Sequence, residues 1–579
     1  MTIGAILGLL AVNLALVGVG LGLVYALRPL GSRRDILRFA GLGYLLAIGA
    51  NGVVLTAELV VGIPVRVPTM VLTSLGIGLA GVAVGRARGH AAPALRRPLR
   101  VPPVAVITAG AVAVVVVYLE ALFRAARLTG LVEWDGWAFW VPKALTIHRY
   151  GGLEDSWFLL LPGPSYPPVV PLLEAASFHA MGGIDPVTLH VQFWCLQAGF
   201  LWFLGGVLAG RVRGVVLVPS LVAVVVMPDL VRRALDAQAD LLVGYLLAAA
   251  AVIVLLWLER SEAWQLPAAT VLLAGAMLTK REGLLVAACV LVAAAVATVR
   301  ERRARWPRLA VVGVIAFVLS LPWRIWFMSK GLPGDSPEAG LFGFLTDLDR
   351  GFGSFRLSLE THFLPGLWWA TPFLLVTAAA LAWLAGRRRL AVYAAGVFAL
   401  CILAATWVVW SIPELPITRE GGVNPIIRLV GSSALLAASL TPLLLDRVLT
   451  ACGWVPGALV RQRLSPLVAA AVVAVPAISF PAAALLDGGA HFPSVVECRP
   501  AARDGEPIRA VFGRFERAHD AEALLARVRE VGYASARAEP DGCGLVRVGV
   551  HGVTSLEGGR DLQREARTVG LEPRLEADS

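Results

Sequence analysis

One segment of the sequence concentrates side chains that can carry out acid–base chemistry. It reads TGLVEWDGWAFWVPKALTIHRYGGL, with Glu133 and Asp135 set among tryptophans and Lys143 following them. A carboxylate held between indole rings at a membrane surface loses hydration and binds a proton more readily than a free one. A general base needs this property. We therefore predict that Asp135 is a catalytic base, with Glu133 as the nearby alternative and Lys143 as a partner for an anionic group.

The same region is rich in aromatic side chains, which we predict to line a substrate loop. They are Trp134, Trp137, Trp140 and Tyr166. Tryptophan also anchors proteins at membrane interfaces, so a purely structural role for the indoles stays open. Tyr166 lies at the start of SYPPVVPLLEAASFHAMGGIDP, where the two prolines that follow it predict a short helix lying in the interface.

The elements that must position these residues are membrane spans. Hydrophobic residues make up 58% and charged residues 16% of the 579 residues, against roughly 45–50% and about 25% in soluble domains. The apolar blocks are about 15 to 25 residues long, as needed to cross about 30 Å of hydrocarbon. We predict a polytopic α-helical membrane protein of about fourteen spans, two of them short enough to be half-helices. The predicted spans are 4–27, 39–61, 68–86, 103–124, 187–210, 214–228, 241–257, 265–279, 283–299, 308–327, 361–385, 390–411, 429–447 and 466–487.

Charge fixes the predicted orientation of these spans. Every second loop is rich in arginine, which indicates that those loops are cytoplasmic and that both chain termini lie outside. All three lysines, Lys143, Lys280 and Lys330, then fall on the outward side. Lysine there opposes the usual charge bias and indicates a ligand, although chance can also place three lysines there. The outward loops are 125–186, 229–240, 328–360 and 412–428.

The net charge of +11 comes largely from these short arginine-rich loops, so it indicates topology and not a nucleic-acid partner. Of the six cysteines, Cys498 and Cys543 lie in a charged C-terminal tail that lacks long apolar runs. An oxidising compartment would allow these two to form a disulfide.

Five short segments carry a resemblance to a known family. In order they are WDGWAFWVPKA, SYPPVVPLL, DAQADLLVGYLLA, LTKREGLL and PWRIWF. Together they resemble the GT-C membrane glycosyltransferases, in the bacterial branch that groups protein mannosyltransferases with Rgt-type lipopolysaccharide glycosyltransferases. The likeness covers about 103–445, within a predicted GT-C-like domain at 103–487, and leaves 1–102 as additional spans. It implies transfer of a sugar from a polyprenyl-phosphate donor to an envelope glycan, lipid or protein on the outer face of a bacterial plasma membrane.

The resemblance also implies roles for particular carboxylates. Asp135 matches the catalytic acidic position of the first large outer loop, and Asp236 or Asp240 matches a second acidic position at the start of a later span. Either could instead cap that helix, since Asp is a favoured N-cap residue. Asp229 is a further candidate. The early loop has a Glu before Trp-Asp in place of an adjacent acidic pair, which leaves open which carboxylate is the base and whether a divalent metal is needed. We assign no metal ligands.

A phosphate-bearing donor needs cations. Besides Lys143, the candidates are Lys280, Arg281, Arg419 and Arg428, which could form charge-assisted bonds to phosphate. Lys280 and Arg428 could instead extend from helix ends to the interface. No glycine-rich loop of nucleotide-binding type is present, so a lipid-linked donor is favoured over a soluble sugar nucleotide. The base would deprotonate an acceptor hydroxyl while the cations stabilise the leaving phosphate, with inversion at the sugar.

The tail, 498–579, repeats one pattern twice: strand, amphipathic helix, glycine, strand. Gly532 and Gly570 stand where the two helices should end. Two such units predict a βαββαβ, ferredoxin-like α+β domain. With VFGRF and VRVGV as paired strands, it resembles the SPOR domain, which implies peptidoglycan binding. A generic module that packs on the enzyme is the alternative.

Two other classes of protein compete with the glycosyltransferase. A transporter or flippase of a lipid-linked envelope precursor also has many spans, although its usual internal repeats and deeply placed charges are not evident here. A scaffold that has lost its transferase chemistry is the other.

Overall fold

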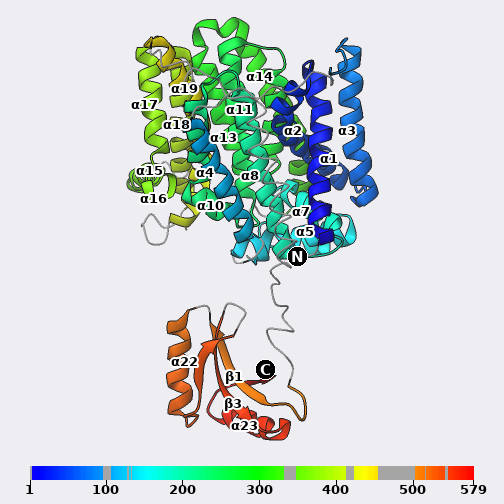
Figure 1. Ribbon diagram of the computed structural model, residues 1–579, viewed down its shortest axis with the longest axis vertical. Helices are drawn as coiled ribbons and strands as arrows, with labels where there is room; N and C mark the ends of the chain where they lie inside the picture. Colours follow the sequence, from blue (N-terminus) through cyan, green and yellow to red (C-terminus); the bar gives the residue numbers. More distant parts are fainter. Residues whose placement is uncertain are drawn as a thin grey trace. The chain divides into compact units, whose positions relative to one another are not determined.

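The computed structural model describes residues 3–94, 106–126, 130–131, 133–331, 347–412, 423–453, 502–515, 517–541 and 545–578. The chain divides into two compact units, Met1–Gly489 and Ala490–Ser579. The first is helical, and the second contains a small antiparallel sheet with two helices (Figure 1).

The long apolar helices of the first unit are those of a multi-pass membrane protein. Within the described ranges, nine helices are long and apolar enough to cross a membrane. Two more, α9 (Gly214–Val225) and α10 (Pro228–Ala234), are bent by 60° at Pro228 and would form a tenth span as a pair. The nine are α1 (Ile3–Leu27), α2 (Arg33–Val60), α3 (Val67–Ala87), α4 (Val106–Ala126), α8 (Pro186–Leu208), α11 (Ala239–Arg260), α14 (Arg302–Ser329), α18 (Arg388–Ser411) and α19 (Val423–Ala451).

Three shorter apolar helices coincide with further predicted spans: α12 (Gln265–Met277), α13 (Glu282–Ala297) and α17 (Thr371–Leu384). The prediction of a single span at 361–385 is wrong at its start. Two separate helices, α15 (Leu348–His362) and α16 (Pro365–Trp368), precede α17. The break falls at Trp369, whose φ of 54° is incompatible with a continuous helix. The predicted span at 466–487 lies outside the described residues.

Burial separates central from peripheral helices. The apolar window of α11 is 100% buried, and that of α8 is 94% buried, whereas α3 is 11% and α14 is 28% buried. Figure 1 shows α8 and α11 in the middle of the bundle and α3 at its edge. Apolar faces exposed on peripheral helices suit contact with lipid hydrocarbon, which is why these helices can remain hydrophobic all round.

The first three helices pack backbone to backbone through glycine. A Cβ at Gly20 of α1 would lie 1.8 Å from the carbonyl oxygen of Gly43 on α2. A Cβ at Gly22 would lie 2.5 Å from the carbonyl oxygen of Gly78 on α3. Small residues allow such close helix contacts in membranes. These glycine contacts hold α1 closely against both α2 and α3.

The segment after α4 is folded into short helices. A π-helix, η1 (Asp135–Trp140), leads directly into α5 (Val141–Tyr150), and α6 (Asp155–Phe158) follows. The helix predicted after Pro168 is present as α7 (Val169–Met181). Figure 1 shows α5, α7, α10, α15 and α16 at one end of the bundle. This end carries the loops that were predicted to face outward.

The second unit has the predicted order of elements. They are β1 (Ile508–Phe515), α22 (Ala518–Glu530), β2 (Arg537–Pro540), β3 (Val546–Val553), α23 (Leu556–Thr568) and β4 (Arg574–Ala577). The strands pair antiparallel in the order β2-β3-β1-β4. Ala521 and Val528 of α22 and Ala566 of α23 share one core with Val548 of β3. Gly532 and Gly570 follow the two helices with φ of 112° and 75°, as expected of C-terminal glycines. Cys498 and Cys543 lie outside the described residues.

Candidate functional site

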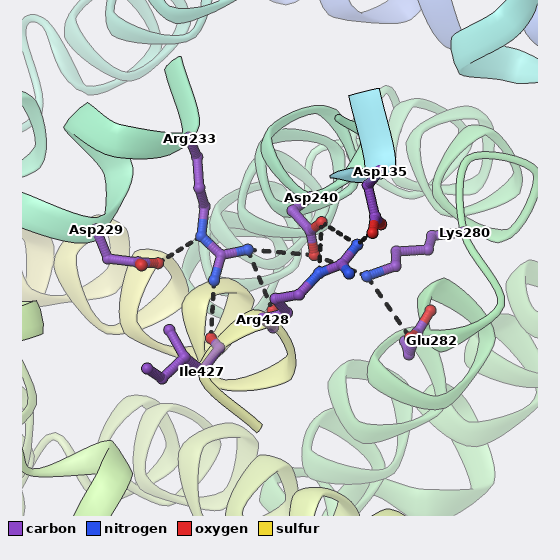
Figure 2. Close-up of polar contacts among 8 residues, drawn as sticks. All are labelled: Asp135, Asp229, Arg233, Asp240, Lys280, Glu282, Ile427 and Arg428. Atoms are coloured by element: carbon purple, nitrogen blue, oxygen red, sulfur yellow. Dashed lines mark hydrogen bonds and ion pairs between the residues drawn. The ribbon is translucent and has the colours of Figure 1, made fainter. Parts of the chain in front are cut away.

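A buried carboxylate of α11 is the centre of a network of ion pairs (Figure 2). Asp240 Oδ1 lies 2.7 Å from Lys280 Nζ and 3.2 Å from Arg233 Nη1, and its Oδ2 lies 2.9 Å from Arg428 Nη2. The Asp240 side chain is only 1% exposed. Three cations around one buried carboxylate compensate for its lost hydration. Asp240 therefore holds together the starts of α11, α13 and α19.

Arg428 connects this centre to Asp135. Its Nη2 donates to Asp135 Oδ2 at 2.5 Å and to Asp240 Oδ2 at 2.9 Å. Four predicted site residues, Asp135, Asp240, Lys280 and Arg428, are thus brought together from distant parts of the sequence (Figure 2). The Asp135 side chain is 18% exposed, against 1% for Asp240. Of the two carboxylates, Asp135 is the one that a substrate could reach.

Sequence reasoning missed Arg233. It donates to Asp229, four residues earlier on α10, and to the carbonyl oxygen of Ile427 at 2.9 Å. These bonds tie α10 to the start of α19 and keep Arg233 and Asp229 buried. The sequence does contain a signal for Arg233, because an Asp and an Arg four residues apart can pair on one face of a helix.

Asp236 is a further buried carboxylate on which the charge of Glu133 acts. Asp236 lies in the turn between α10 and α11, and its Oδ2 is buried with no hydrogen-bond partner in the described part of the chain. Burial, and after it the charge of Glu133, raises the pKa of Asp236 to about 7. A carboxylate with a pKa near neutrality is suited to exchange protons with a substrate. Asp236 is therefore a structural candidate for the base beside Asp135.

Neither Asp236 nor Asp240 occupies the N-cap position of α11. The N-cap position of α11 is Gln238, and it makes no side-chain capping bond. Asp240 lies in the first helical turn, where its carboxylate is engaged by cations. The alternative that Asp236 or Asp240 is the N-cap residue of this helix is therefore not what the structure has.

A small hollow opens beside the network. It encloses about 230 Å³ of empty space, part of it open to solvent, and its polar lining comprises Asp240, Lys280, Glu282, Arg428 and Ser432. Lys280 Nζ also lies 3.6 Å from Glu282 Oε1. The seven charged residues of the network are four carboxylates, Asp135, Asp229, Asp240 and Glu282, and three cations, Arg233, Lys280 and Arg428 (Figure 2). The network alone is thus not cationic.

The predicted aromatic residues divide into two groups. Trp140 is fully buried, and its ring and that of Phe139 meet the Tyr166 ring edge to face at 5.8 and 5.1 Å between centroids. Trp134 and Trp137 are each 52% exposed. Exposed indoles beside Asp135 are placed either to meet a substrate or to anchor the segment at an interface.

Lys143 contacts its own loop. Its ammonium group donates to the carbonyl oxygen of Gly163 and lies 3.7 Å from the centroid of the Phe139 ring. These contacts hold α5 against the segment that precedes α7. Its predicted role in binding phosphate stays a prediction.

Arg281 lies near Tyr166 and the residue before it. Its Nη1 donates to Ser165 Oγ at 3.2 Å, and its guanidinium carbon lies 5.8 Å from the centroid of the Tyr166 ring. Arg419 lies outside the described residues. No group of three or more His, Cys, Asp or Glu side chains suited to a metal ion occurs in the described ranges.

A much larger, apolar hollow lies between α1, α2, α3 and α7. It comprises about 1340 Å³ of empty space, part of it open to the outside, and its lining is mostly aliphatic, with Asn51, Ser74 and His179 among the exceptions. Val169, which lines this hollow, donates its backbone N–H to the carbonyl oxygen of Leu278 at 3.3 Å. Leu278 is two residues before Lys280. The lining of the hollow and the segment that carries Lys280 therefore share a backbone hydrogen bond.

No family model, curated protein or solved structure matches this chain. The functional assignment accordingly rests on the residues of the site and on the sequence resemblance described above.

Proposed function

We propose that the protein is an inverting membrane glycosyltransferase that moves a sugar from a polyprenyl-phosphate donor to a cell-envelope acceptor. The observation that carries this proposal is the contact of Arg428 with both Asp135 and Asp240. A reachable carboxylate held beside buried cations provides both a base and groups that stabilise a leaving phosphate.

The placement of the network supports a functional role. Asp240 and Arg428 lie in helices that are long and apolar enough to span a membrane. Ionisable residues in such helices are costly and usually mark functional sites. Apolar residues packed at these positions would keep the bundle as stable, so stability alone does not explain the buried ion pairs.

The proposed mechanism is a direct displacement at the sugar's anomeric carbon. Asp135 accepts the proton of an acceptor hydroxyl, whose oxygen attacks the anomeric carbon as the bond from that carbon to the phosphate oxygen breaks. Asp236, beside Glu133, is the alternative base. Phosphate binding near Arg428 would compete with Asp135 for the guanidinium, which would release the carboxylate as the donor arrives.

A lipid-linked donor is supported by the apolar hollow between α1, α2, α3 and α7. In a bilayer such a space suits a hydrocarbon chain, because its lining offers few hydrogen-bonding partners to water. Val169 in its lining bonds to Leu278, two residues before Lys280, and we propose that a lipid chain in this hollow extends from a phosphate at the charged network.

We further propose a bacterial plasma-membrane location, with the arginine-rich loops in the cytoplasm and the network and tail outside. The proposed protein has about fourteen membrane spans, which are arranged as in the GT-C glycosyltransferases. The tail would act as a SPOR-like peptidoglycan-binding module. Pull-down of residues 498–579 on isolated sacculi tests the tail, and absence of binding would leave the generic module as its description.

The enzyme is tested with purified protein in nanodiscs, given a panel of radiolabelled polyprenyl-phosphate sugars and envelope acceptors. Asp135→Asn should lower turnover about 100- to 10,000-fold, the usual contribution of a general base. Asp155→Asn is the matched control, because Asp155 follows in the same loop and pairs with Lys330 instead of Arg428. Equal activity of both variants would count against Asp135 as the base.

A flippase of a lipid-linked envelope precursor is the second candidate. The 60° bend between α9 and α10, beside the buried pair Asp229–Arg233, favours it, because broken helices near charged sites are typical of transporters. Translocation of a fluorescent polyprenyl-phosphate sugar in liposomes without any acceptor would support the flippase. Release of sugar only when an acceptor is present would support the transferase.

A further inference from the structure

A carboxylate just after α11 is held by two arginines from other parts of the chain. Glu262 Oε1 lies 2.8 Å from Arg211 Nη2, and its Oε2 lies 4.0 Å from Arg28 Nη1. Trp264 Nε1 donates to Oε2 at 2.6 Å. Arg28 follows α1, and Arg211 lies between α8 and α9. Glu262 therefore brings two guanidinium groups together from separate helices.

Arg38, near the start of α2, is linked to both of these arginines. Its guanidinium carbon lies 5.3 Å from the centroid of the Phe39 ring, and that of Arg28 lies 4.2 Å from the same centroid. Arg38 Nη2 donates at 3.5 Å to the carbonyl oxygen of Val207, which is four residues before Arg211. Each arginine thus shares a neighbour or a chain segment with the other two. We call Arg28, Arg38 and Arg211 the arginine cluster.

The arginine cluster has buried hydrogen-bond donors without acceptors. Nε of all three arginines and Nη1 of Arg211 are buried and have no hydrogen-bond partner among the described residues. The Arg211 side chain is only 6% exposed. A buried guanidinium N–H without an acceptor is costly, and a buried charge is costly unless an opposite charge accompanies it. An anion bound to the cluster would satisfy both requirements.

Positive charge also exceeds negative charge here. Glu262 and Asp35, which is in the first turn of α2, are two carboxylates against the three guanidinium groups. None of the ion pairs among the described residues includes Arg38. The other charged residues beside Arg211 form two balanced pairs, Arg213 with Asp446 and Arg447 with Glu259.

The arginine cluster lies far from the charged network around Asp240. Asp240 is in the first turn of α11, and Glu262 comes two residues after the end of that helix. The 22 residues of α11 separate the two carboxylates by about 33 Å. This length matches the hydrocarbon thickness of a bilayer, about 30 Å. In a membrane that α11 spans, the cluster therefore lies at the surface opposite the network, level with lipid head groups.

Apolar surface beside the cluster favours a lipid as its ligand. Arg88, which follows α3, donates from Nη1 to the carbonyl oxygen of Ala26 at 3.0 Å, so the end of α3 lies beside the end of α1. Val82 and Val84 of α3 are 41% and 44% exposed. The Arg28 side chain is 23% exposed, so a ligand can reach the cluster. Acyl chains would cover this apolar surface, whereas a soluble anion would leave it exposed.

We infer that the arginine cluster binds the phosphate group of an anionic membrane lipid. Guanidinium groups bind phosphate oxygens through charge-assisted and often bidentate hydrogen bonds. Basic pockets between transmembrane helices hold anionic head groups in this way. The site is separate from the proposed catalytic centre.

Binding is measured by native mass spectrometry of the full-length protein, with phosphatidylglycerol and phosphatidylcholine as lipid probes and inorganic phosphate as a soluble probe. The wild-type protein should retain phosphatidylglycerol in preference to phosphatidylcholine. Arg38→Ala should weaken this binding about 10- to 100-fold, the usual effect of losing a charge-assisted bond. Arg38→Lys keeps the charge and loses the planar fork, so its affinity should lie between those two. Arg34→Ala is the matched control and should bind as the wild type does, because Arg34 is exposed one turn earlier on α2.

Wild-type affinity of both Arg38 variants for phosphatidylglycerol would overturn the inferred site. Equal losses in Arg34→Ala and Arg38→Ala would also overturn it, because the arginines would then attract lipid only through their general charge. Binding of inorganic phosphate without any preference for phosphatidylglycerol would overturn the lipid as the ligand. If Arg38→Ala does not fold, Arg38→Lys carries the test. None of these measurements requires sugar transfer, so they stay valid if the proposed enzyme activity fails.

Discussion

Replacing Asp240 with Asn should have the largest effect on stability of any single change in the network. The substitution leaves Lys280, Arg233 and Arg428 around a neutral amide, although their nitrogens lie 2.7–3.2 Å from the carboxylate in the native protein. Breaking a buried ion pair from one side costs about 3–5 kcal/mol. At roughly 2–4 °C per kcal/mol for large domains, the midpoint of thermal unfolding should fall by roughly 6–20 °C.

The assay is thermal unfolding of the purified protein in detergent, followed by tryptophan fluorescence. Glu259→Gln is the matched control, because Glu259 lies near the other end of α11 and pairs with Arg447 at 2.5 Å. Arg447 keeps a second carboxylate, Asp446, at 2.8 Å, so this control should cost less than about 1 kcal/mol. Both variants remove one negative charge from α11. Asp240→Asn leaves three cations around a neutral amide, whereas Glu259→Gln leaves Arg447 with Asp446 as its partner.

A second substitution tests whether the uncompensated cations cause the loss of stability. Adding Lys280→Met to Asp240→Asn removes one of the uncompensated cations and should recover about 0.5–3 kcal/mol, the usual range for coupled neighbours. The reasoning is refuted if Asp240→Asn unfolds at the same temperature as Glu259→Gln. It is equally refuted if Lys280→Met lowers stability further in the Asp240→Asn background.

Three further predictions concern the pH profile, the helix packing and the tail. If Asp236 is the base in place of Asp135, turnover should rise with pH through about 7, because Asp236 must lose its proton before it can accept another. Asp236→Asn should then remove this rise, and a profile that the substitution leaves unchanged would exclude Asp236 as the base. Gly20→Ala should destabilise the protein measurably in the same thermal assay, because the added Cβ would meet the Gly43 backbone. Gly18→Ala is the control and should not, because there is open space around its Cβ. Equal unfolding temperatures of the two variants would refute the close packing. Arg514→Ala should destabilise the second unit, because Arg514 pairs with Glu576 at 2.5 Å and with Asp541 at 3.2 Å, and both carboxylates are nearly buried. Amide hydrogen exchange of β1 in the full-length protein should therefore become faster. Unchanged protection of β1 would contradict this prediction.

Hydropathy predicted the long helices well, because crossing a membrane sets a minimum length that an apolar block reveals directly. It did not predict the division of 361–385. The apolar residues of α17 continue back through Trp368 and Trp369, and hydropathy is insensitive to the positive φ at Trp369 that separates α16 from α17.

The site was predicted residue by residue but not as a network. Asp135, Asp240, Lys280 and Arg428 were each named, yet sequence spacing could not show that Arg428 contacts both carboxylates, because those contacts depend on how α19 packs beside η1 and α11.

The π-helix that begins at Asp135 makes the site sensitive to chain length. A π-helix closes its hydrogen bonds over one residue more than an α-helix does. Inserting one further residue after Ala138 would rotate Asp135 by about 100° relative to α5, the rotation of one helical residue. The carboxylate would then turn away from Arg428 although no charged residue had been changed. For this protein, the number of residues between Asp135 and the buried Trp140 is as much a part of the candidate site as their identity.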